Sequence, residues 1–269
     1  MATAFPSSLV TLRFKSLGSG SSGNATVVQA RSGAQLAHLL IDCGLGIREL
    51  DKRLRAAGML ADQIDAVFIT HEHGDHIGCA RQLVLRERIP VYMSEGTYAA
   101  IGQPDFDGLL RLCCDGVAFE VGALQVRPFT VPHDAREPLQ LTCTDGDARL
   151  GVVTDLGHVS AHVMQELAGC ATLLLECNHD EELLRASSYP PFLKRRVGGP
   201  YGHLANSAAA ALAQSLLAAG HLRQVVAGHL SEQNNKPELA RAALAEALGC
   251  GPDDVHVADG PSGSGWLAA

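Results

Sequence analysis

The sequence predicts a four-layered α/β/β/α sandwich, in which two β-sheets pack face to face and helices cover their outer faces. Two observations lead to this fold class. Apolar strand-like runs alternate with helical patterns in the first and last thirds of the chain, whereas the middle third is rich in strands. No internal repeat or linker-like change of composition divides the sequence, so residues 1–269 are expected to form a single domain.

The first third begins with apolar runs that glycine and serine residues separate, and these residue types favour turns. Two helical patterns follow, each next to a further apolar run. Strands are expected at residues 10–17, 25–29, 35–41, 66–70 and 91–93, and helices at residues 46–57 and 76–88.

In the middle third, short apolar runs are bounded by polar residues, and Asp145-Gly146-Asp147 is a hairpin signal between two of them. The last third alternates helix and strand again. Strands are expected at residues 117–121, 124–131, 139–143, 149–153, 171–175, 224–227 and 255–257, and helices at residues 159–168, 180–194, 206–219 and 236–248.

Composition narrows the class of function. The formal net charge of -8 is unlike that of proteins that coat nucleic acid through a broad basic surface. No apolar run approaches the ~20 residues of a membrane-spanning helix. Residues 1–15 lack the pattern of a signal peptide, so we expect a cytoplasmic protein without a membrane partner. The eight cysteines form no Cys-x-x-Cys pair and are expected to be mostly buried free thiols.

The most informative motif is His71-Glu72-His73-Gly74-Asp75-His76, which directly follows the apolar run at residues 66–70. Imidazole and carboxylate groups suit zinc and neighbouring first-row metals. In an extended segment, residues i and i+2 point the same way, so His71 and His73 can bind one metal together. Asp75 and His76 begin the next helix and can face a second metal.

Three later residues have the same character. His133, Asp155 and His229 each follow an apolar strand-like run and carry a metal-ligating group. Loops at strand ends converge on one edge of a layered fold, so we expect these side chains to lie beside the first cluster.

Together, these motifs resemble those of the metallo-β-lactamase superfamily. The order is His-x-His-x-Asp-His, then His133, then Asp155 in Thr-Asp-Leu-Gly, then His229 at a strand end. Asp42 in Leu-Ile-Asp-Cys-Gly matches the aspartate that orients the metal loop in that superfamily. Finer matches to the YycJ/WalJ-like branch, which looks like a group of DNA-acting nucleases, lie at residues 16–24, 132–135, 176–180, 202–206 and 228–235.

The resemblance implies a metallo-β-lactamase fold with two divalent metal ions. A water or hydroxide between the metals would be the nucleophile, and its pKa would fall towards ~7. Zinc is expected because histidines predominate, with manganese as the alternative. The implied ligands are His71, His73 and His133 for the first metal, Asp75, His76 and His229 for the second, and Asp155 as a bridge.

The resemblance also suggests residues that act beside the metals. His203 matches a general-acid histidine, although it could simply be a residue at the start of a helix. Glu176 could orient His203 or form a salt bridge at a strand end. His179 belongs to the same Glu-Cys-Asn-His-Asp match, and a place beside the ligands is left open for it.

Two segments are candidates for phosphate binding. The loop at residues 18–24 could cradle an anion with its backbone N–H groups and the side chains of Ser21, Ser22 and Asn24, or could be a plain hairpin loop. The basic cluster Lys194-Arg195-Arg196 could supply further phosphate contacts, or could be a solvated helix end.

The implied activity is a metal-dependent phosphodiesterase or nuclease that resembles a DNA exonuclease. The alternative is a thioester or lactone hydrolase of the glyoxalase II type, which shares the ligand set. A neutral lactone would not require the basic cluster, and His73 disfavours a redox protein of the flavo-diiron type. The basic residues are few, so any nucleic-acid footprint should be short, such as a strand end, and a homodimer is left open. Ala205 departs from the family pattern, which has serine there.

Overall fold

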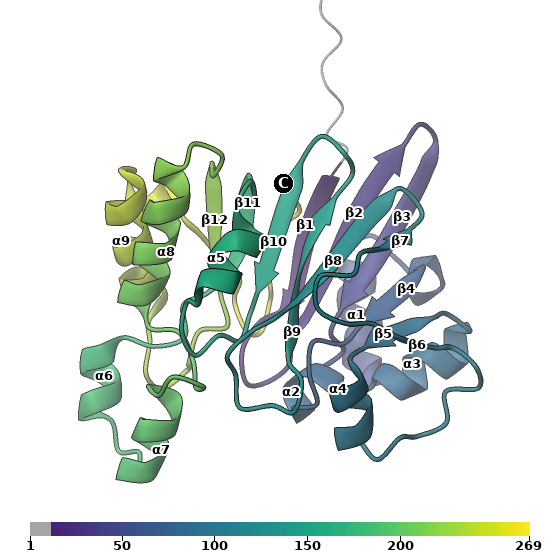
Figure 1. Cartoon of the computed structure of the whole chain (residues 1–269), viewed down its shortest axis with the longest axis horizontal. Coiled ribbons are helices and arrows are strands. Elements are labelled where there is room, and N and C mark those ends of the chain that lie inside the picture. The colour runs from purple at the N-terminus through teal and green to yellow at the C-terminus, as the bar shows by residue number, and fades with distance from the viewer. Residues whose placement is uncertain (1–11) are drawn as a thin grey trace, which may run out of the picture.

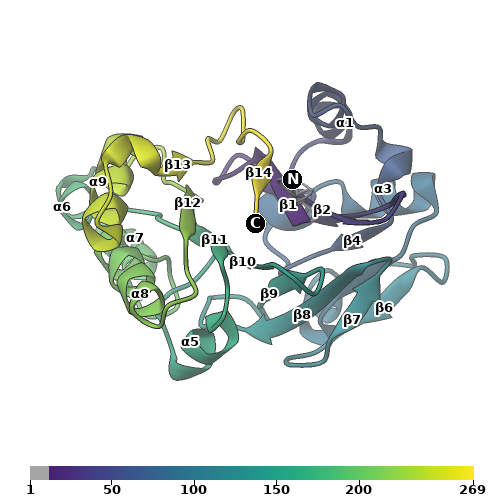
Figure 2. The same ribbon diagram turned by 90° about the horizontal axis from the view of Figure 1, so that it is seen from above.

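The computed structural model describes residues 12–269 and contains two seven-stranded sheets that pack face to face (Figures 1 and 2). The first sheet has the strand order β14-β1-β2-β3-β4-β5-β6 and is antiparallel from β14 to β3 and parallel from β3 to β6. Its strands are β1 (Leu12–Gly18), β2 (Ala25–Ser32), β3 (Gln35–Ile41), β4 (Ala66–Phe68), β5 (Val91–Met93), β6 (Leu110–Leu112) and β14 (Leu267–Ala268).

The second sheet has the order β13-β12-β11-β10-β9-β8-β7, and its strands from β10 to β13 are parallel. Parallel strands place their carboxyl ends at one edge, and the loops that carry the site follow these ends. The strands are β7 (Phe119–Val121), β8 (Leu124–Thr130), β9 (Leu139–Thr144), β10 (Arg149–Val153), β11 (Thr172–Glu176), β12 (Gln224–Gly228) and β13 (His256–Val257).

Helices cover the outer faces of the two sheets, as Figure 2 shows. Short 3₁₀ helices lie at Ala61–Gln63 and Pro252–Asp254. The first half contributes α1 (Ile47–Ala56), α2 (Gly74–Ile77), α3 (Ala80–Glu87) and α4 (Glu95–Ala100). The second half contributes α5 (Ala161–Leu167), α6 (Glu181–Ala186), α7 (Pro191–Val197), α8 (Asn206–Ala218) and α9 (Pro237–Leu248).

Three hydrophobic clusters hold the four layers together. In β2, Val28 belongs to the cluster between the sheets, whereas its neighbour Val27 packs in the cluster beneath α1 and α3. In β11, Leu174 lies between the sheets and Leu173 packs beneath α5, α8 and α9. Successive strand residues point to opposite faces, so each central strand buries side chains on both sides. The αββα architecture predicted from the sequence is therefore confirmed.

The structure corrects several predicted elements. The helix expected at residues 76–88 is broken, because Gly78 has a φ of 26° and lies against the chain at Cys43. A Cβ on Gly78 would lie 2.3 Å from the Cys43 carbonyl oxygen. The helical region at residues 180–194 is two helices, α6 and α7. Three further elements, α4, β6 and β14, are not predicted from the sequence.

Other expectations concern composition. Val10 and Thr11, at the start of the first expected strand, lie outside the described residues, as does most of the segment in which a signal peptide was sought. Within residues 12–269, none of the helices combines the length and apolar character needed to cross a bilayer. All eight cysteines are free thiols and five of them are buried, as predicted.

Candidate metal centre and hydrolytic site

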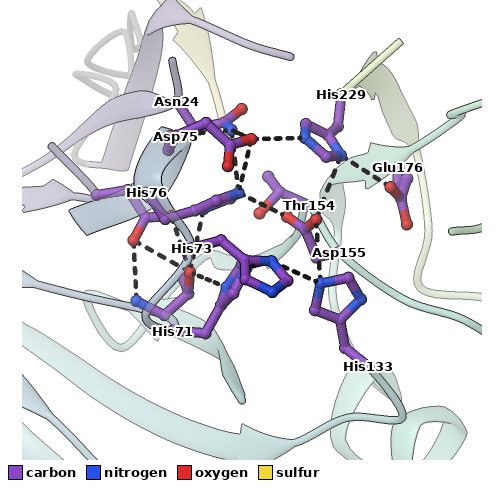
Figure 3. Close-up of polar contacts among 12 residues, drawn as sticks. Asn24, His71, His73, Asp75, His76, His133, Thr154, Asp155, Glu176 and His229 are labelled. Carbon is purple, nitrogen blue, oxygen red and sulfur yellow. Dashed lines mark hydrogen bonds and ion pairs between the residues drawn. The ribbon is translucent and has the colours of Figure 1, made fainter. Parts of the chain in front are cut away.

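The predicted ligands converge at one edge of the sandwich (Figure 3). Four of the loops that carry them directly follow β4, β8, β10 and β12, each of which has buried residues at or next to its end. Because these strands are held by hydrogen bonds and two hydrophobic layers, their ends fix the positions of the loops. This convergence of strand ends predicts that His71, His133, Asp155 and His229 lie together, and the structure brings them together.

The first ligand set consists of His71, His73 and His133. His73 Nδ1 lies 3.0 Å from His71 Nε2 and 3.4 Å from His133 Nε2. Ligand nitrogens around a tetrahedral zinc ion, with Zn–N bonds of ~2.0–2.1 Å, are separated by about 3.3 Å. The three ring nitrogens are therefore spaced as a metal ion requires.

The second ligand set consists of Asp75, His76 and His229. Asp75 Oδ2 lies 3.6 Å from His76 Nε2 and 3.7 Å from His229 Nε2. Asp155 lies between the two sets, with Oδ2 at 3.0 Å from His76 Nε2 and Oδ1 at 3.6 Å from His133 Nε2. Its carboxylate thus reaches both sets, as the bridging role requires.

Two buried atoms within the site have ion-pair neighbours but no hydrogen bond of good geometry. They are His229 Nε2 and Asp155 Oδ2, although both residues are almost fully buried. An unsatisfied buried polar atom costs about 1–3 kcal/mol. A cation bound at this point would contact both atoms, so the residues present fit a divalent metal centre.

Hydrogen bonds outside the ligand sets select which ring nitrogen faces inward. His71 Nδ1 lies 3.0 Å from Thr70 Oγ1, and His133 Nδ1 donates to the Gly202 carbonyl at 2.9 Å. His76 Nδ1 lies 2.7 Å from Asp42 Oδ2, and Asp42 is buried, as its predicted orienting role requires. In each of these three rings the opposite nitrogen, Nε2, therefore points into the ligand set, and histidines that bind metals in proteins are held in the same way.

Glu176 has a larger role than the sequence suggested. Its Oε1 accepts hydrogen bonds from His203 Nδ1 and His229 Nδ1, both at 2.8 Å. Its Oε2 accepts the backbone N–H groups of Leu156, at 2.7 Å, and Leu204, at 3.1 Å. One buried carboxylate therefore positions a metal ligand, the candidate acid and two loops.

His203 lies close to one histidine of each ligand set. Its ring centroid is 5.3 Å from that of His133 and 5.3 Å from that of His229. Burial opposes the charged form, but Glu176 and then Asp155 outweigh it and raise the pKa of His203. Nδ1 of His203 is bonded to Glu176, so Nε2 is the ring nitrogen on the opposite side from this carboxylate.

The electrostatics of the two sets differ. Burial, reinforced by His76, lowers the pKa of His71 well below its usual value, and burial also lowers the pKa of His133. Burial works against the charged forms of His76 and His229 as well, but Asp155 and the other nearby carboxylates outweigh it. The pKa of His76 is raised strongly, and that of His229 is raised to about 10.

Backbone geometry holds the second ligand set in place. His229 has a φ of 54°, an uncommon conformation for a residue other than glycine, and its N–H donates to Ser19 Oγ at 2.7 Å. Gly44 lies so close to Asp75 that a Cβ would approach the Asp75 carbonyl oxygen to 1.7 Å. The supporting roles of Ser19 and Thr70 are not predicted from the sequence, because hydroxyl residues near a turn carry no distinctive signal.

The residues predicted to bind substrate differ in burial and in their contacts. Asn24 is buried, and its Nδ2 lies 3.0 Å from His76 Nε2 and 3.3 Å from Asp75 Oδ2, so it supports the ligands rather than lining a free cradle. Ser21 and Ser22 are exposed on the same loop. His179 is buried near the start of α8, where its carbonyl accepts the Asn206 N–H.

The three residues of the basic cluster also have different contacts. Lys194 Nζ donates to the Arg185 carbonyl oxygen and so faces α6. Arg196 Nε lies 2.6 Å from Asp134 Oδ2, and Asp134 Oδ1 is 3.4 Å from His133 Nε2. Arg196 is therefore tied to the rim of the metal centre, and Arg195 is exposed beside it.

Comparisons with known proteins agree with this geometry. A model of the beta-lactamase superfamily domain matches residues 37–229. The chain belongs to this superfamily. It is 33% identical over 241 residues to exodeoxyribonuclease YycJ of Bacillus anthracis, covering 88% of this chain and 89% of that protein. It is 31% identical over 246 residues to exodeoxyribonuclease WalJ of Streptococcus pneumoniae, covering 89% of each.

A solved structure confirms the fold. The metallo-beta-lactamase fold protein YhfI from Bacillus subtilis superposes with a TM-score of 0.71 at 18% identity, covering 94% of this chain and 98% of that one. The family and its relatives make this superfamily member a hydrolase that uses divalent metal ions. The YycJ/WalJ-like resemblance read from the sequence is thereby confirmed.

Proposed function

We propose that this hydrolase is a phosphodiesterase with two metal ions that removes nucleotides from the end of a DNA strand. The observation that carries the proposal is the pair formed by His203 and Glu176. A phosphodiester loses an alkoxide, which needs a proton, whereas a thiolate leaving group does not. A histidine held close to both ligand sets by a buried carboxylate is suited to that proton transfer.

In this proposal, each of the two ligand sets would hold one divalent cation, and Asp155 would serve as a ligand to both. The predominance of imidazole favours zinc, with manganese as the second candidate. When bound, the cations supply an activated water and positive charge that stabilises the negatively charged transition state. His203 donates its proton from Nε2 to the departing oxygen. Glu176 is the positioning residue that holds the Nδ1 proton of His203 and keeps Nε2 directed towards the substrate.

Arg196 and Arg195 would contact the phosphates next to the bond that is cleaved. Arg196 lies at the rim of the metal centre through its ion pair with Asp134. A guanidinium group binds phosphate with two parallel hydrogen bonds. The net charge of -8 restricts this grip to a few phosphates, which supports a strand end as the substrate. The free cysteines support a cytoplasmic location, and the names of the relatives support DNA.

The direct test compares three substrates with the metal-loaded protein: an end-labelled single strand of DNA, bis(p-nitrophenyl) phosphate and a thioester. We expect cleavage of both phosphodiesters and stepwise shortening of the DNA. His203→Ala should lower the rate on DNA by about 10²–10⁴-fold. It should lower the rate on bis(p-nitrophenyl) phosphate much less, because the nitrophenolate leaves without a proton.

The matched control is His221→Ala, which removes an exposed histidine outside the site and should change neither rate. Thioester turnover without phosphodiester cleavage would overturn the proposal in favour of the glyoxalase II type of reaction. Equal losses on both phosphodiesters in His203→Ala would remove the assignment of His203 as the acid.

A further inference from the structure

Aromatic and basic residues lie on α7 and just after it, and the ion pair between Arg196 and Asp134 connects this segment to the rim of the metal centre. The catalytic proposal does not use the aromatic residues. We define the α7 surface as Phe192, Arg195, Arg196 and Tyr201. The side chains of Phe192 and Tyr201 are 66% and 60% exposed, and they are the two large aromatic residues exposed to this degree within residues 12–269. Figure 1 shows α7 on the same lower side of the molecule as α2, which carries ligands of the metal centre.

The spacing of α7 gathers three of these residues on one side. Phe192, Arg195 and Arg196 are related by three and four positions, so they lie on the same face of the helix. Lys194 points elsewhere and bonds to the end of α6. The exposed face of α7 therefore combines one aromatic ring with two guanidinium groups.

Tyr201 is fixed to the loops that form the metal centre. The next residue, Gly202, accepts the hydrogen bond of the ligand His133 through its carbonyl oxygen. A Cβ on Gly157 would lie 2.6 Å from Tyr201 Cα, so the Tyr201 backbone packs closely on the loop that follows Asp155. The Tyr201 ring nevertheless remains exposed, although burying such a ring would stabilise the fold.

The chemistry of the α7 surface matches one kind of ligand. Unpaired nucleobases stack on exposed aromatic rings, and each stack contributes about 1–3 kcal/mol independently of sequence. Arginine binds the phosphates between the bases. Arg195 and Arg196 provide local positive charge in a chain whose formal net charge is -8. Bases within a duplex are already stacked on one another, so only a single strand offers free faces to such rings.

We propose that the α7 surface holds the unpaired bases of a single-stranded nucleic acid while the adjacent phosphodiester lies at the metal centre. This inference rests on the proposed phosphodiesterase function and specifies its substrate. Tyr201 stacks on the base nearest the bond that is cleaved, and Phe192 stacks on a base farther along the strand. Arg195 and Arg196 contact the phosphates between them.

The test uses the metal-loaded full chain and two oligonucleotides, one natural and one with abasic sites in place of its terminal nucleotides. Tyr201→Ala should raise KM for the natural strand by about 10-fold or more, with little change in kcat. Tyr201→Phe keeps the ring and should retain the wild-type KM. On the abasic strand, Tyr201→Ala and wild type should have the same KM, because no base is present to stack.

Leu112→Ala is the matched control, since it removes another exposed apolar side chain on β6. It should leave KM unchanged on both strands, and thermal melting will verify that each variant folds. A second measurement follows the fluorescence of a terminal 2-aminopurine in a methylphosphonate-linked strand that cannot be cleaved. Wild type and Tyr201→Phe should quench it, and Tyr201→Ala should not.

Two failures can be told apart. If the wild-type protein cleaves DNA but Tyr201→Ala raises KM equally on both strands, or on neither, the α7 surface does not bind bases and the proposed function still stands. If the wild-type protein cleaves no phosphodiester, the proposed function itself fails. An increase in KM that Tyr201→Phe shares with Tyr201→Ala would assign the effect to the hydroxyl and would also overturn the inference.

Discussion

The two ligand sets of the metal centre use the same imidazole chemistry but are supported by opposite kinds of partner. In the first ligand set, His71 and His133 are held by neutral oxygens, namely the Thr70 hydroxyl and the Gly202 carbonyl. In the second, His76 and His229 are held by the buried carboxylates of Asp42 and Glu176. The difference shows that buried carboxylates hold the histidines of only the second ligand set, whereas the carboxylate near His73 and His133, that of Asp134, is exposed at the rim.

This asymmetry explains the opposite pKa shifts. The first ligand set presents rings whose protonated forms burial disfavours, so they are ready to bind a cation at neutral pH. The second attracts positive charge and holds protons when no other cation is bound. Metal binding to the second ligand set is therefore an exchange of protons for a cation.

Asp155→Asn should have the largest effect, because Asp155 is the residue that joins the two sets. The amide preserves the size of the side chain but removes the negative charge that lies between the two ligand sets. We expect hydrolysis to fall by about 10³-fold or more and the metal content to drop below two ions for each chain. Elemental analysis and phosphodiesterase assays would measure both effects.

The exposed residue Asp253 supplies the control for this variant, since Asp253→Asn removes the same charge away from the metal centre. If Asp155→Asn retained two tightly bound ions and full activity, the two sets would be independent, and the comparison between them would describe two unrelated sites.

Glu176→Gln should weaken the two sets unequally. It removes the carboxylate behind His229 and leaves the partners of His71 and His133 untouched. Loss of such a partner typically weakens metal binding by about 10–100-fold, and we expect this loss in the second ligand set alone. Stepwise zinc titration against a chromophoric chelator would resolve the two affinities.

Glu166→Gln is a close control for that experiment, because Glu166 is also a buried carboxylate but pairs with Arg127 outside the site. It should leave both zinc affinities unchanged. Equal weakening of both ligand sets in Glu176→Gln would show that the carboxylate stabilises the whole centre rather than one half of it.

Metal binding to the two ligand sets should depend differently on pH. The pKa of His76 is raised strongly and that of His229 is raised to about 10. A metal must therefore displace protons from the second ligand set at neutral pH, and its affinity should rise with pH by about tenfold per pH unit for each proton displaced. The pKa values of His71 and His133 are lowered, so above about pH 6.5 the first ligand set should change much less. The same titration at about pH 6.5 and about pH 8.5 would test this. Parallel slopes for both sets would contradict the asymmetry.

The sequence was most informative where chemistry and strand ends coincide. His133, Asp155 and His229 could be predicted because a ligand type directly follows a buried apolar run, and strand ends converge whatever the length of chain between them. The supporting contacts could not be predicted in this way. Ser19 bonds to the backbone of His229 across 210 positions, and no periodicity connects a serine to so distant a partner.

The same limit applies to parts of the fold. β14 is a two-residue strand whose only signal is its pairing with β1 at the other end of the chain. Asn24 was predicted to contact phosphate because it lies in a glycine and serine loop. In the structure, its side chain contacts Asp75 and His76. Local sequence identified the loop, and only tertiary structure could show what the loop contacts.

Ala205→Ser should have the smallest effect, and it separates the stability of the scaffold from the charge behind the second ligand set. Ala205 is the N-cap of α8 with a ψ of 156°, and its side chain makes no capping hydrogen bond. A serine hydroxyl there can accept from the backbone N–H of Ser207 or Ala208, which should stabilise the fold by about 0.5–2 kcal/mol. Because α8 begins just after the segment that Glu176 holds, chemical denaturation should show higher stability while both zinc affinities stay unchanged. A change in the second zinc affinity would mean that the rigidity of this segment, and not only the carboxylates behind it, sets the difference between the two ligand sets.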